Sequence, residues 1–256
     1  MKNIQSAERV SAADAPDKYV FQRSLFAYHR AAAQVSGDVL EIGTGSGYGI
    51  SIISSKANIF LTIDKNYPPV DLSDYGNVEF HKMTVPPLAG MPTAGFDYVI
   101  CFQVIEHIRR DFDLLREIHR VLRPGGKLIV TTPNKKMSIT RNPWHVREYT
   151  PDEFINLLEC NFASVEAMGV FGREKVMEYY EQNKRSVARI ARFDIFRFNK
   201  WLPKVLLRIP YDLLNRFNRR KLLVKNRELT SHIGMDDYYL APVGDECFDL
   251  FYIAEK

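Results

Sequence analysis

A glycine-rich stretch near the beginning of the chain carries the residue types best suited to hold a cofactor. The segment Glu41-Ile42-Gly43-Thr44-Gly45-Ser46-Gly47 has glycines at alternate positions and an acid two residues before the first of them. Glycine allows a tight turn and a close approach of a ligand to the backbone. The dinucleotide fingerprint would need a glycine where Tyr48 stands. The acid suits a cofactor that carries an ammonium group, although a structural strand-to-helix turn is an equal alternative for this stretch taken alone.

A second acid stands at the end of the next apolar run. Asp64 follows residues 59–63 and lies 23 residues after Glu41. An open α/β sheet presents an acid at this place to the ribose of a cofactor, where one carboxylate can accept hydrogen bonds from two hydroxyls. The glycine stretch and Asp64, in this order, therefore predict a two-point cofactor site.

Buried strands that alternate with helices must position these residues. Short apolar strands are predicted at 39–42, 59–63, 78–82, 96–102, 127–132, 164–170 and 247–254. Helices are predicted at 18–35, 50–55 and 111–122, and a further helix begins at Thr150-Pro151, where Thr150 is the expected N-cap. The apolar face of the 111–122 helix is assigned to Phe112, Leu115, Ile118 and Leu122. The alternation predicts an α/β fold with a mostly parallel sheet.

Length, composition and charge limit the alternatives. A chain of 256 residues can bury one substantial core, and its three cysteines are far apart and form no C-x-x-C pair, which predicts neither a disulfide framework nor a zinc site. With no signal peptide or apolar stretch long enough to span a bilayer, we expect a cytoplasmic protein. The net charge of +4 hides a basic block, because residues 184–227 hold 14 Lys and Arg against Asp194 and Asp212.

Four segments in order resemble the successive motifs of class I S-adenosylmethionine-dependent methyltransferases: VLEIGTGSGYG, LTIDKN, FDYVICFQVIEHI and LREIHRVLRPGGKLIVTTPN. The resemblance covers roughly residues 19–134 and is closest to the broad bacterial group that contains the ubiquinone and menaquinone methyltransferases. It implies a Rossmann-like, doubly wound sheet of seven strands in three α/β/α layers, with a final antiparallel strand at 247–254. S-adenosyl-L-methionine is the implied cofactor.

Carried over position by position, the resemblance implies cofactor contacts at Glu41, Gly43, Gly45, Gly47, Tyr48, Asp64, Lys65, Thr84 and Gln103. The glycine stretch would meet the amino-acid end of the cofactor, Asp64 its ribose and Gln103 its methionine portion. Thr84 stands where many relatives have an Asp or Asn that meets the adenine amino group. A shifted residue or a backbone group is therefore expected to replace that contact.

The candidate catalytic residues are Glu106, His107 and His145. They follow the fourth and fifth strands, where loops meet at the open end of a parallel sheet, and each can act as a base toward an acceptor that must lose a proton. A packed helix start is the alternative for His107. For the Trp144-Tyr149 segment the alternative is a structural latch in which Arg147 and Glu148 pair.

A metal is not expected at this place. Relatives that bind a divalent metal have carboxylates at the positions of Gln103 and Glu106 and a histidine at that of His107. Gln103 lacks the anionic oxygen that a hard cation prefers.

The chain is predicted to divide into a methyltransferase core, at 1–171 and 246–256, and a helical, basic insertion at 172–245. The insertion stands where this family commonly builds a cover over the acceptor. Aromatic and leucine residues alternate with the basic ones, which fits a lid over a lipid-like, quinone or sugar acceptor, or a peripheral contact of 184–227 with an anionic membrane.

The predicted activity is methyl transfer to O or N of a small molecule. Two alternatives stay open: a nucleic-acid-binding methyltransferase, and a methyltransferase-like scaffold without catalysis. We expect no nucleic-acid partner, because no Asn/Asp-Pro-Pro-Tyr/Phe element follows the fourth strand. The sequence does not determine the oligomeric state.

Overall fold

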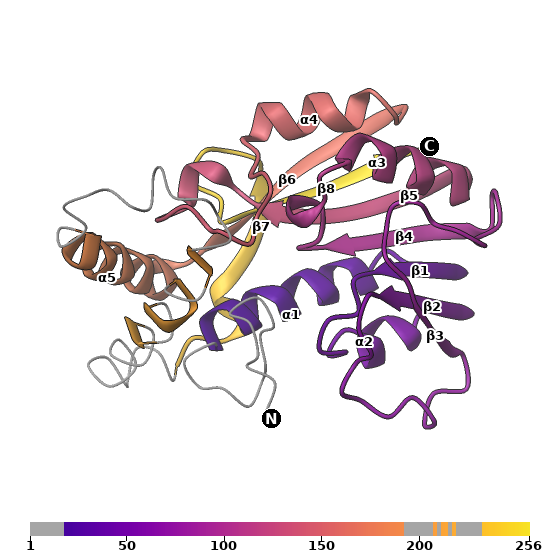
Figure 1. Ribbon diagram of the computed structural model, residues 1–256, viewed down its shortest axis with the longest axis horizontal. Coiled ribbons are helices and arrows are strands. Elements are labelled where there is room, and N and C mark those ends of the chain that lie inside the picture. The colour runs from indigo at the N-terminus through magenta and orange to yellow at the C-terminus, as the bar shows by residue number, and fades with distance from the viewer. Residues whose placement is uncertain (1–17, 192–206, 209–210, 215–216, 219–231) are drawn as a thin grey trace.

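One eight-stranded sheet runs through the computed structural model, which describes residues 18–191, 207–208, 211–214, 217–218 and 232–256 (Figure 1). The strands are β1 (Asp38–Ile42), β2 (Ile59–Asp64), β3 (Val78–Lys82), β4 (Phe96–Phe102), β5 (Leu122–Pro133), β6 (Ser164–Gly172), β7 (Tyr238–Pro242) and β8 (Asp249–Glu255). Their order across the sheet is β3-β2-β1-β4-β5-β8-β6-β7. The first five are parallel neighbours, and β8 runs antiparallel between β5 and β6. The predicted α/β fold and its last antiparallel strand are confirmed.

The prediction of seven strands is wrong by one. β7 pairs antiparallel with β6, from Met168 beside Pro242 to Gly172 beside Tyr238, and forms the edge of the sheet. This edge strand lies within 172–245, the segment predicted to be a helical insertion. Its five residues follow a long basic stretch, so the sequence pattern alone did not separate it from that stretch.

Helices cover both faces of the sheet, as Figure 1 shows. The helices are α1 (Lys18–Ala32), α2 (Ile50–Ser54), α3 (Asp111–Val121), α4 (Pro151–Glu159) and α5 (Glu174–Ala191). One apolar core lies beneath α3 and α4 and includes Leu114 and Phe154. The other lies beneath α1, α2 and α5 and includes Ala27, Ile53 and Val176. The sheet is therefore buried between two layers, which explains its almost continuously apolar central strands.

Two local expectations around α3 need correction. Phe112 is 44% exposed, and the fully buried face consists of Leu114, Leu115, Ile118 and Val121. One residue turns a helix by about 100°, so a shift of the face by one or two positions removes Phe112 from the core. β5 begins at Leu122, before the predicted position 127, because the Arg123-Pro124-Gly125-Gly126 segment forms an irregularity within the strand.

The start of α4 follows its local sequence closely. The Thr150 hydroxyl accepts a hydrogen bond from the Glu153 backbone N–H, and the Glu153 carboxylate accepts one from the Thr150 N–H. Pro151 occupies the first turn, where its missing N–H leaves no bond unmade. The predicted N-cap is confirmed.

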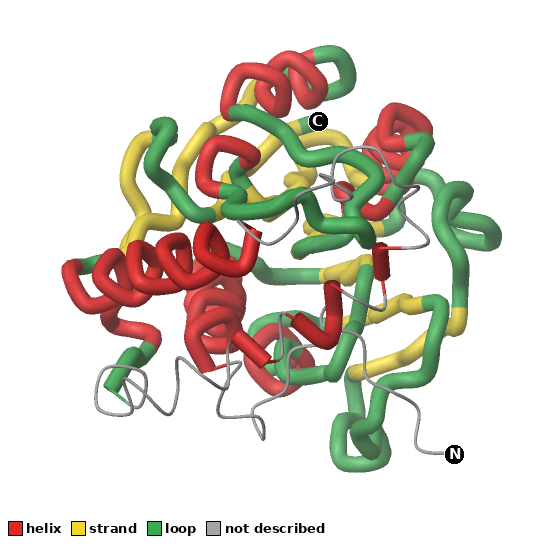
Figure 2. Tube along the Cα trace, turned by 60° about the vertical axis from the view of Figure 1, so that its left-hand side comes forward, coloured by secondary structure: helices red, strands yellow, loops and turns green. Residues whose placement is uncertain are grey.

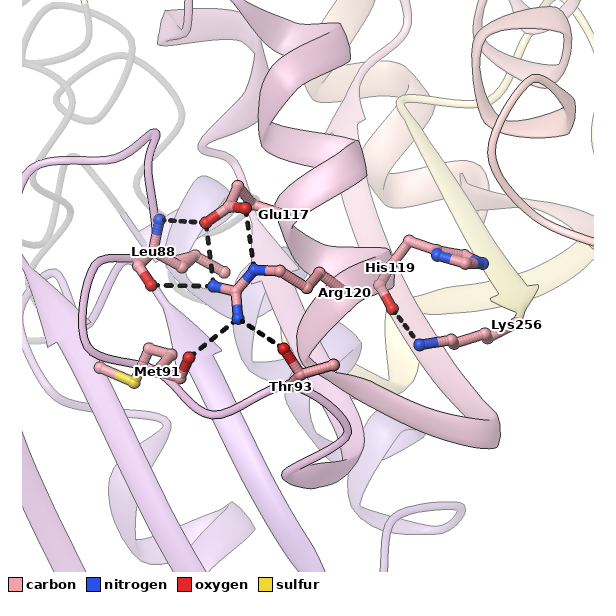
Figure 3. Close-up of polar contacts among 7 residues, drawn as sticks. All are labelled: Leu88, Met91, Thr93, Glu117, His119, Arg120 and Lys256. Carbon is pink, nitrogen blue, oxygen red and sulfur yellow. Dashed lines mark hydrogen bonds and ion pairs between the residues drawn. The ribbon is translucent and has the colours of Figure 1, made fainter.

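Arg120 near the end of α3 fixes the loop between β3 and β4 (Figure 3). Its guanidinium donates to the carbonyls of Met91 and Leu88 at 2.9 and 3.1 Å, and it pairs with Glu117 at 2.9 Å. Glu117 in turn accepts from the Leu88 N–H at 2.9 Å. These contacts hold the loop that connects β3 to β4.

Within the described residues, no helix is both long and apolar enough to cross a membrane.

Candidate active site

The glycine stretch forms the loop from β1 to α2, at the carboxyl edge of the parallel strands. Gly43 and Gly45 adopt positive φ angles of 96° and 57°, a region that other residues enter at a cost. A Cβ on Gly43 would lie 2.4 Å from the Val104 side chain, so the turn also requires glycine for space. The Gly45 N–H donates to Asp64 Oδ2 at 3.0 Å, which joins the two predicted halves of the cofactor site.

A cavity of about 320 Å³ opens over this loop. The predicted cofactor residues that line it are Gly43, Gly45, Tyr48, Asp64, Lys65, Thr84 and Gln103. Its wall also includes Tyr28 of α1, Phe102 at the end of β4, and two residues from later segments, His107 and Trp144. We call it the donor cavity. Among the described residues, its lining does not include Glu41 or Gly47, whose predicted contacts with the cofactor stay predictions.

Glu41 lies beneath the loop and is 1% exposed. The Tyr28 hydroxyl donates to its Oε1 at 2.6 Å, and the Thr62 hydroxyl donates to its Oε2. Burial raises the pKa of Glu41 to about 7, because the two hydroxyl donors offset the desolvation only in part. Tyr28 lines the donor cavity, so Glu41 positions a wall of that cavity from behind.

Gln103 directly follows β4 and has a backbone conformation that non-glycine residues rarely adopt, with φ 55°. Its N–H donates to the Thr131 carbonyl at 2.9 Å, and its side-chain amide donates to the Thr131 hydroxyl at 3.3 Å. Such strain persists where the surroundings impose it, and it gathers at functional sites. The side chain lines the donor cavity.

The structure brings the three catalytic candidates together. Glu106 and His107 lie in a short 3-10 helix (Ile105–His107), and His145 comes from the loop before α4. One side-chain ligand atom from each lies within 4.8 Å of the others, a spacing that a metal ion could also use, so the expected absence of a metal stays a prediction. Glu106 is buried and accepts from the Thr132 hydroxyl at 3.1 Å, and the His107 and His145 ring centroids are 5.0 Å apart.

His145 is held by its own loop. Its Nδ1 donates to Glu148 at 2.7 Å, and its Nε2 accepts from the Asn142 amide at 2.8 Å. The pairing of Arg147 with Glu148 that the latch alternative required is not formed, because Arg147 instead reaches Asp111 at the start of α3, at 2.7 Å. The Glu148 carboxylate already binds the His145 imidazole, and Arg147 pairs with Asp111 instead.

A second cavity of about 210 Å³ lies between α1, α5 and the loop after β5. Its lining includes Tyr19 and Arg23 of α1, Tyr179 and Tyr180 of α5, and Phe248 just before β8. His145 also lines it, whereas His107 lines the donor cavity, so the two imidazoles stand between the cavities. We call it the aromatic cavity.

Sequence reasoning missed two residues of this region. Arg23 Nε pairs with Asp249 Oδ2 at 2.9 Å, and both side chains are largely buried. The available signal was an acid inside the otherwise apolar last strand, where an unpaired carboxylate would be costly. Its partner lies near the opposite end of the chain, so no sequence spacing could identify Arg23.

Parts of the 172–245 segment contact the site. Asp212 accepts from the Trp144 indole N–H at 3.0 Å, and the Arg208 guanidinium lies 4.4 Å from the Trp144 ring centroid. Asn218 bonds Asn183 and Ser186 of α5 at 2.7 and 2.6 Å. Figure 2 turns the α5 side of the molecule forward and shows these short helical pieces. Trp144 lines the donor cavity, so the segment reaches the wall of the site.

Comparison with known proteins assigns the family. The model of the methyltransferase-domain family matches residues 17–166, more than half of the chain. The chain belongs to the methyltransferase-domain family. A Mycolicibacterium smegmatis protein named "Probable S-adenosylmethionine-dependent methyltransferase" is 35% identical over 183 residues, which cover 65% of this chain and 68% of the relative. The ubiquinone biosynthesis O-methyltransferase of Pseudomonas syringae is 27% identical over 103 residues, 38% of this chain and 44% of that protein.

A solved structure agrees with the methyltransferase fold. It comes from Thermotoga maritima, its title reads "SAM-dependent methyltransferase, possible histamine N-methyltransferase", and its TM-score is 0.57 at 12% identity. The match covers 93% of this methyltransferase and 91% of that chain. The enzyme is an S-adenosylmethionine-dependent methyltransferase. The donor cavity fits that cofactor, since a side chain on Gly45 would meet nothing nearer than 3.9 Å and would project into the space over the loop.

Proposed function

We propose that this enzyme transfers a methyl group from S-adenosylmethionine to an oxygen or nitrogen atom of a small molecule bound in the aromatic cavity. The observation that carries the proposal is the pair of neighbouring cavities at one edge of the sheet, with the His107 and His145 rings between them. Methyl transfer is an in-line displacement, so the main task of the protein is to hold donor and acceptor close together and aligned.

The residues around the donor cavity divide the cofactor among them. We assign the ribose hydroxyls to Asp64, the amino-acid end to the glycine loop and the methionine portion to Gln103. Thr84 and Lys65 line the same cavity and are assigned to the adenosine end. When bound, the cofactor supplies the methyl group on a positively charged sulfur atom.

The acceptor side uses the loop clusters. We assign His107 to the wall that faces the donor cavity, and His145 and its partner Glu148 to the aromatic cavity. Glu106 lies behind them and holds the 3-10 turn, because its backbone carbonyl accepts from Val146 at 2.8 Å. A hydroxyl or amine acceptor must lose a proton, so one carboxylate or imidazole of the site has to accept it.

We propose that the core at 1–171 and 246–256 binds the donor and that part of the 172–245 segment covers the acceptor. The family match ends at residue 166, before the insertion, and Tyr211 lines the aromatic cavity. The expected contact of 184–227 with a membrane stays a prediction, because 192–206, 209–210, 215–216 and 219–227 lie outside the described residues.

Calorimetry with S-adenosylmethionine and S-adenosylhomocysteine tests the donor half. Asp64→Ala removes a charged acceptor for two hydroxyls, so affinity is expected to fall by about 10- to 100-fold. Asp74→Ala is the matched control, since Asp74 is exposed and lies outside the cavity lining. An unchanged affinity in Asp64→Ala would remove the ribose assignment.

Incubation of wild-type enzyme and a cell extract with methyl-labelled cofactor tests the transfer itself. We expect label in a small-molecule fraction. Label found in nucleic acid, or tight cofactor binding without any labelled product, would contradict the proposal and favour one of the two alternative functions.

A further inference from the structure

Asp249 contacts one residue from each cavity. It pairs with Arg23, which lines the aromatic cavity, and Gln103 of the donor cavity lies close enough for its side chain to lower the pKa of Asp249. In the sheet Asp249 stands beside Pro133 of β5 and Val170 of β6, at the same edge as the glycine loop. This carboxylate therefore lies between a wall residue of the aromatic cavity and a wall residue of the donor cavity, directly behind the two linings.

One oxygen of Asp249 has no hydrogen bond of regular geometry, although the Gln103 amide is near enough to lower the pKa of the carboxyl. Asp249 is 4% exposed, and its Oδ1 is buried with no hydrogen-bond partner among the described residues. Native proteins rarely leave such an oxygen unpaired, and the exceptions often have a catalytic or ligand role. A bound molecule that donates an O–H or N–H to Oδ1 would supply the missing bond.

The Arg23 guanidinium has five N–H donors, of which the ion pair with Asp249 and a hydrogen bond with Tyr19 use only a part. The ion pair with Asp249 uses Nε, and the side chain, 15% exposed, lines the aromatic cavity. Its guanidinium lies 5.8 Å from the Tyr19 ring centroid and 5.7 Å from that of Phe248. The two Nη groups of an arginine can hold an oxygen atom of a ligand while Nε keeps its carboxylate.

The walls of the cavity favour a flat molecule. The Tyr19 and Tyr179 rings lie 4.6 Å apart between centroids, and the Tyr180 and Phe248 rings 5.3 Å apart. Aromatic side chains bind planar rings by offset stacking and edge contacts. A volume of about 210 Å³ has room for one substituted ring, since an apolar cavity of about 150 Å³ holds benzene.

We propose that Asp249 is the base that accepts the acceptor's proton and that Arg23 binds an oxygen on the same molecule. The acceptor is therefore a planar single ring with an O–H or N–H group next to an oxygen-bearing substituent. This inference rests on the proposed methyltransferase function and adds the substrate class and the base. His145 is the weaker candidate, because both of its ring nitrogens are already engaged within its loop.

The step balances without any further reactant. The O–H or N–H bond of the acceptor breaks and its proton passes to Asp249, while the freed electron pair forms the bond to the methyl carbon. The bond from that carbon to sulfur breaks, its electrons stay on sulfur, and the sulfur loses its positive charge. Asp249 afterwards releases the proton to water.

The groups that face Asp249 stay in one charge state on the acid side of neutrality. Burial raises the pKa of Asp249, and Arg23 and Gln103 offset that effect only in part. Burial also raises the pKa of the neutral groups that face it, namely Tyr19, Tyr48, Tyr238 and Cys247. Arg23 stays charged throughout. Glu41, with its pKa of about 7, and the His107 and His145 imidazoles also lie at or behind the cavities, so the acid side of the rate profile is assigned to Asp249 by measuring it in Glu41→Gln and His107→Asn as well.

Binding of simple rings to the complex with S-adenosylhomocysteine tests the substrate class. The probes are 2-hydroxybenzoate and 2-aminobenzoate, with 2-methoxybenzoate as the ring without a strong donor and cyclohexanecarboxylate as the non-planar control. We expect the first two to bind at least about tenfold more tightly than either control. Equal binding of all four, or no binding of the first two, would overturn the substrate class.

Methyl-label transfer to the better probe tests the base. Asp249→Asn keeps the shape and removes the basic oxygen, so the rate is expected to fall by about 100-fold or more while the affinity for S-adenosylhomocysteine changes less than about twofold. Asp245→Asn, at an exposed carboxylate, is the control and is expected to keep the wild-type rate. Retention of more than about a tenth of the rate by Asp249→Asn, or a 100-fold loss in His107→Asn instead, would overturn the inference.

Two measurements cover the case in which Asp249→Asn does not fold. Arg23→Lys keeps the positive charge but loses the planar pair of Nη donors. Binding of the probe is expected to weaken by about tenfold, with the cofactor affinity unchanged. The kcat/KM of Glu41→Gln, in which Glu41 cannot titrate, is expected to fall on the acid side with one proton, and a flat profile there contradicts the role of Asp249. If S-adenosylhomocysteine itself does not bind, the proposed function fails; if it binds and the probes do not, only this inference fails.

Discussion

The raised pKa of Glu41 is expected to make the stability of the protein depend on pH. This carboxyl is buried under the glycine loop, and burial raises its pKa from 4.5 to about 7. A raised carboxyl pKa in the folded state means that folding takes up a proton above the unfolded pKa. The stability that Glu41 contributes is therefore fully present below pH 4.5 and is lost as the pH rises to about 7.

The size of the loss follows from the shift. One pKa unit corresponds to about 1.4 kcal/mol, so the difference between 4.5 and about 7 amounts to about 3 kcal/mol in the free energy of unfolding. Glu41→Gln keeps the shape and cannot ionise. Its carbonyl can accept from Tyr28 and its amide can donate to the Thr62 oxygen, so both buried contacts have a partner.

The assay is denaturant unfolding of wild type and Glu41→Gln over the range from about pH 5 to about pH 8. Relative to the wild type, the free energy of unfolding of the variant is expected to rise by about 2 to 3 kcal/mol from the low to the high end of this range, with most of the change before pH 7. Taking the difference between the two proteins cancels the titration of all other groups. Glu159→Gln, at an exposed position of α4, is the control for loss of a charge. A difference that stays constant with pH would refute the reasoning from burial.

Two further predictions concern packing around the site. Arg120→Ala is expected to lower the free energy of unfolding by about 2 kcal/mol, because the Met91 and Leu88 carbonyls lose a charged donor, and Arg120→Lys should recover less than half of it; a loss below about 0.5 kcal/mol in denaturant unfolding would contradict the role of these contacts. Gly49→Ala places a Cβ 2.1 Å from the Tyr28 ring and is expected to cost about 1 to 3 kcal/mol and to weaken S-adenosylhomocysteine in calorimetry, since Tyr28 lines the donor cavity. Gly76→Ala, where a Cβ meets nothing within 4 Å, is the control, and equal effects at both glycines would argue against crowding at Tyr28.

Several features of the fold could be predicted from the sequence because interactions between residues close in the chain determine them. The β1 and β4 segments are apolar runs bounded by turn residues, and the Thr150 cap depends on a residue three positions away. The contact of the glycine loop with Asp64 follows from topology, since the carboxyl ends of parallel neighbours meet at one edge. In each case the decisive partner is close in sequence or in an adjacent strand.

The errors occurred where several partners compete for the same side chain. Arg147 has Glu148 beside it in sequence but bonds Asp111, because Glu148 is taken by His145. Phe112 is apolar but sits one helical position outside the buried face of α3. Closeness in sequence and hydrophobicity do not determine which partner a side chain takes or whether it is buried. The arrangement of the surrounding helices and loops determines both.

The sequence by itself determined the parallel sheet, the turn into α2 and the acid that faces it, because local propensity and the direction of parallel strands are enough to place them. Tertiary structure alone decided that Glu41 is buried under Tyr28, that β7 forms the edge of the sheet, and that Arg23 pairs with Asp249 beside the aromatic cavity. Those contacts join residues from distant parts of the chain, and their energies depend on burial, which is a property of the packed molecule.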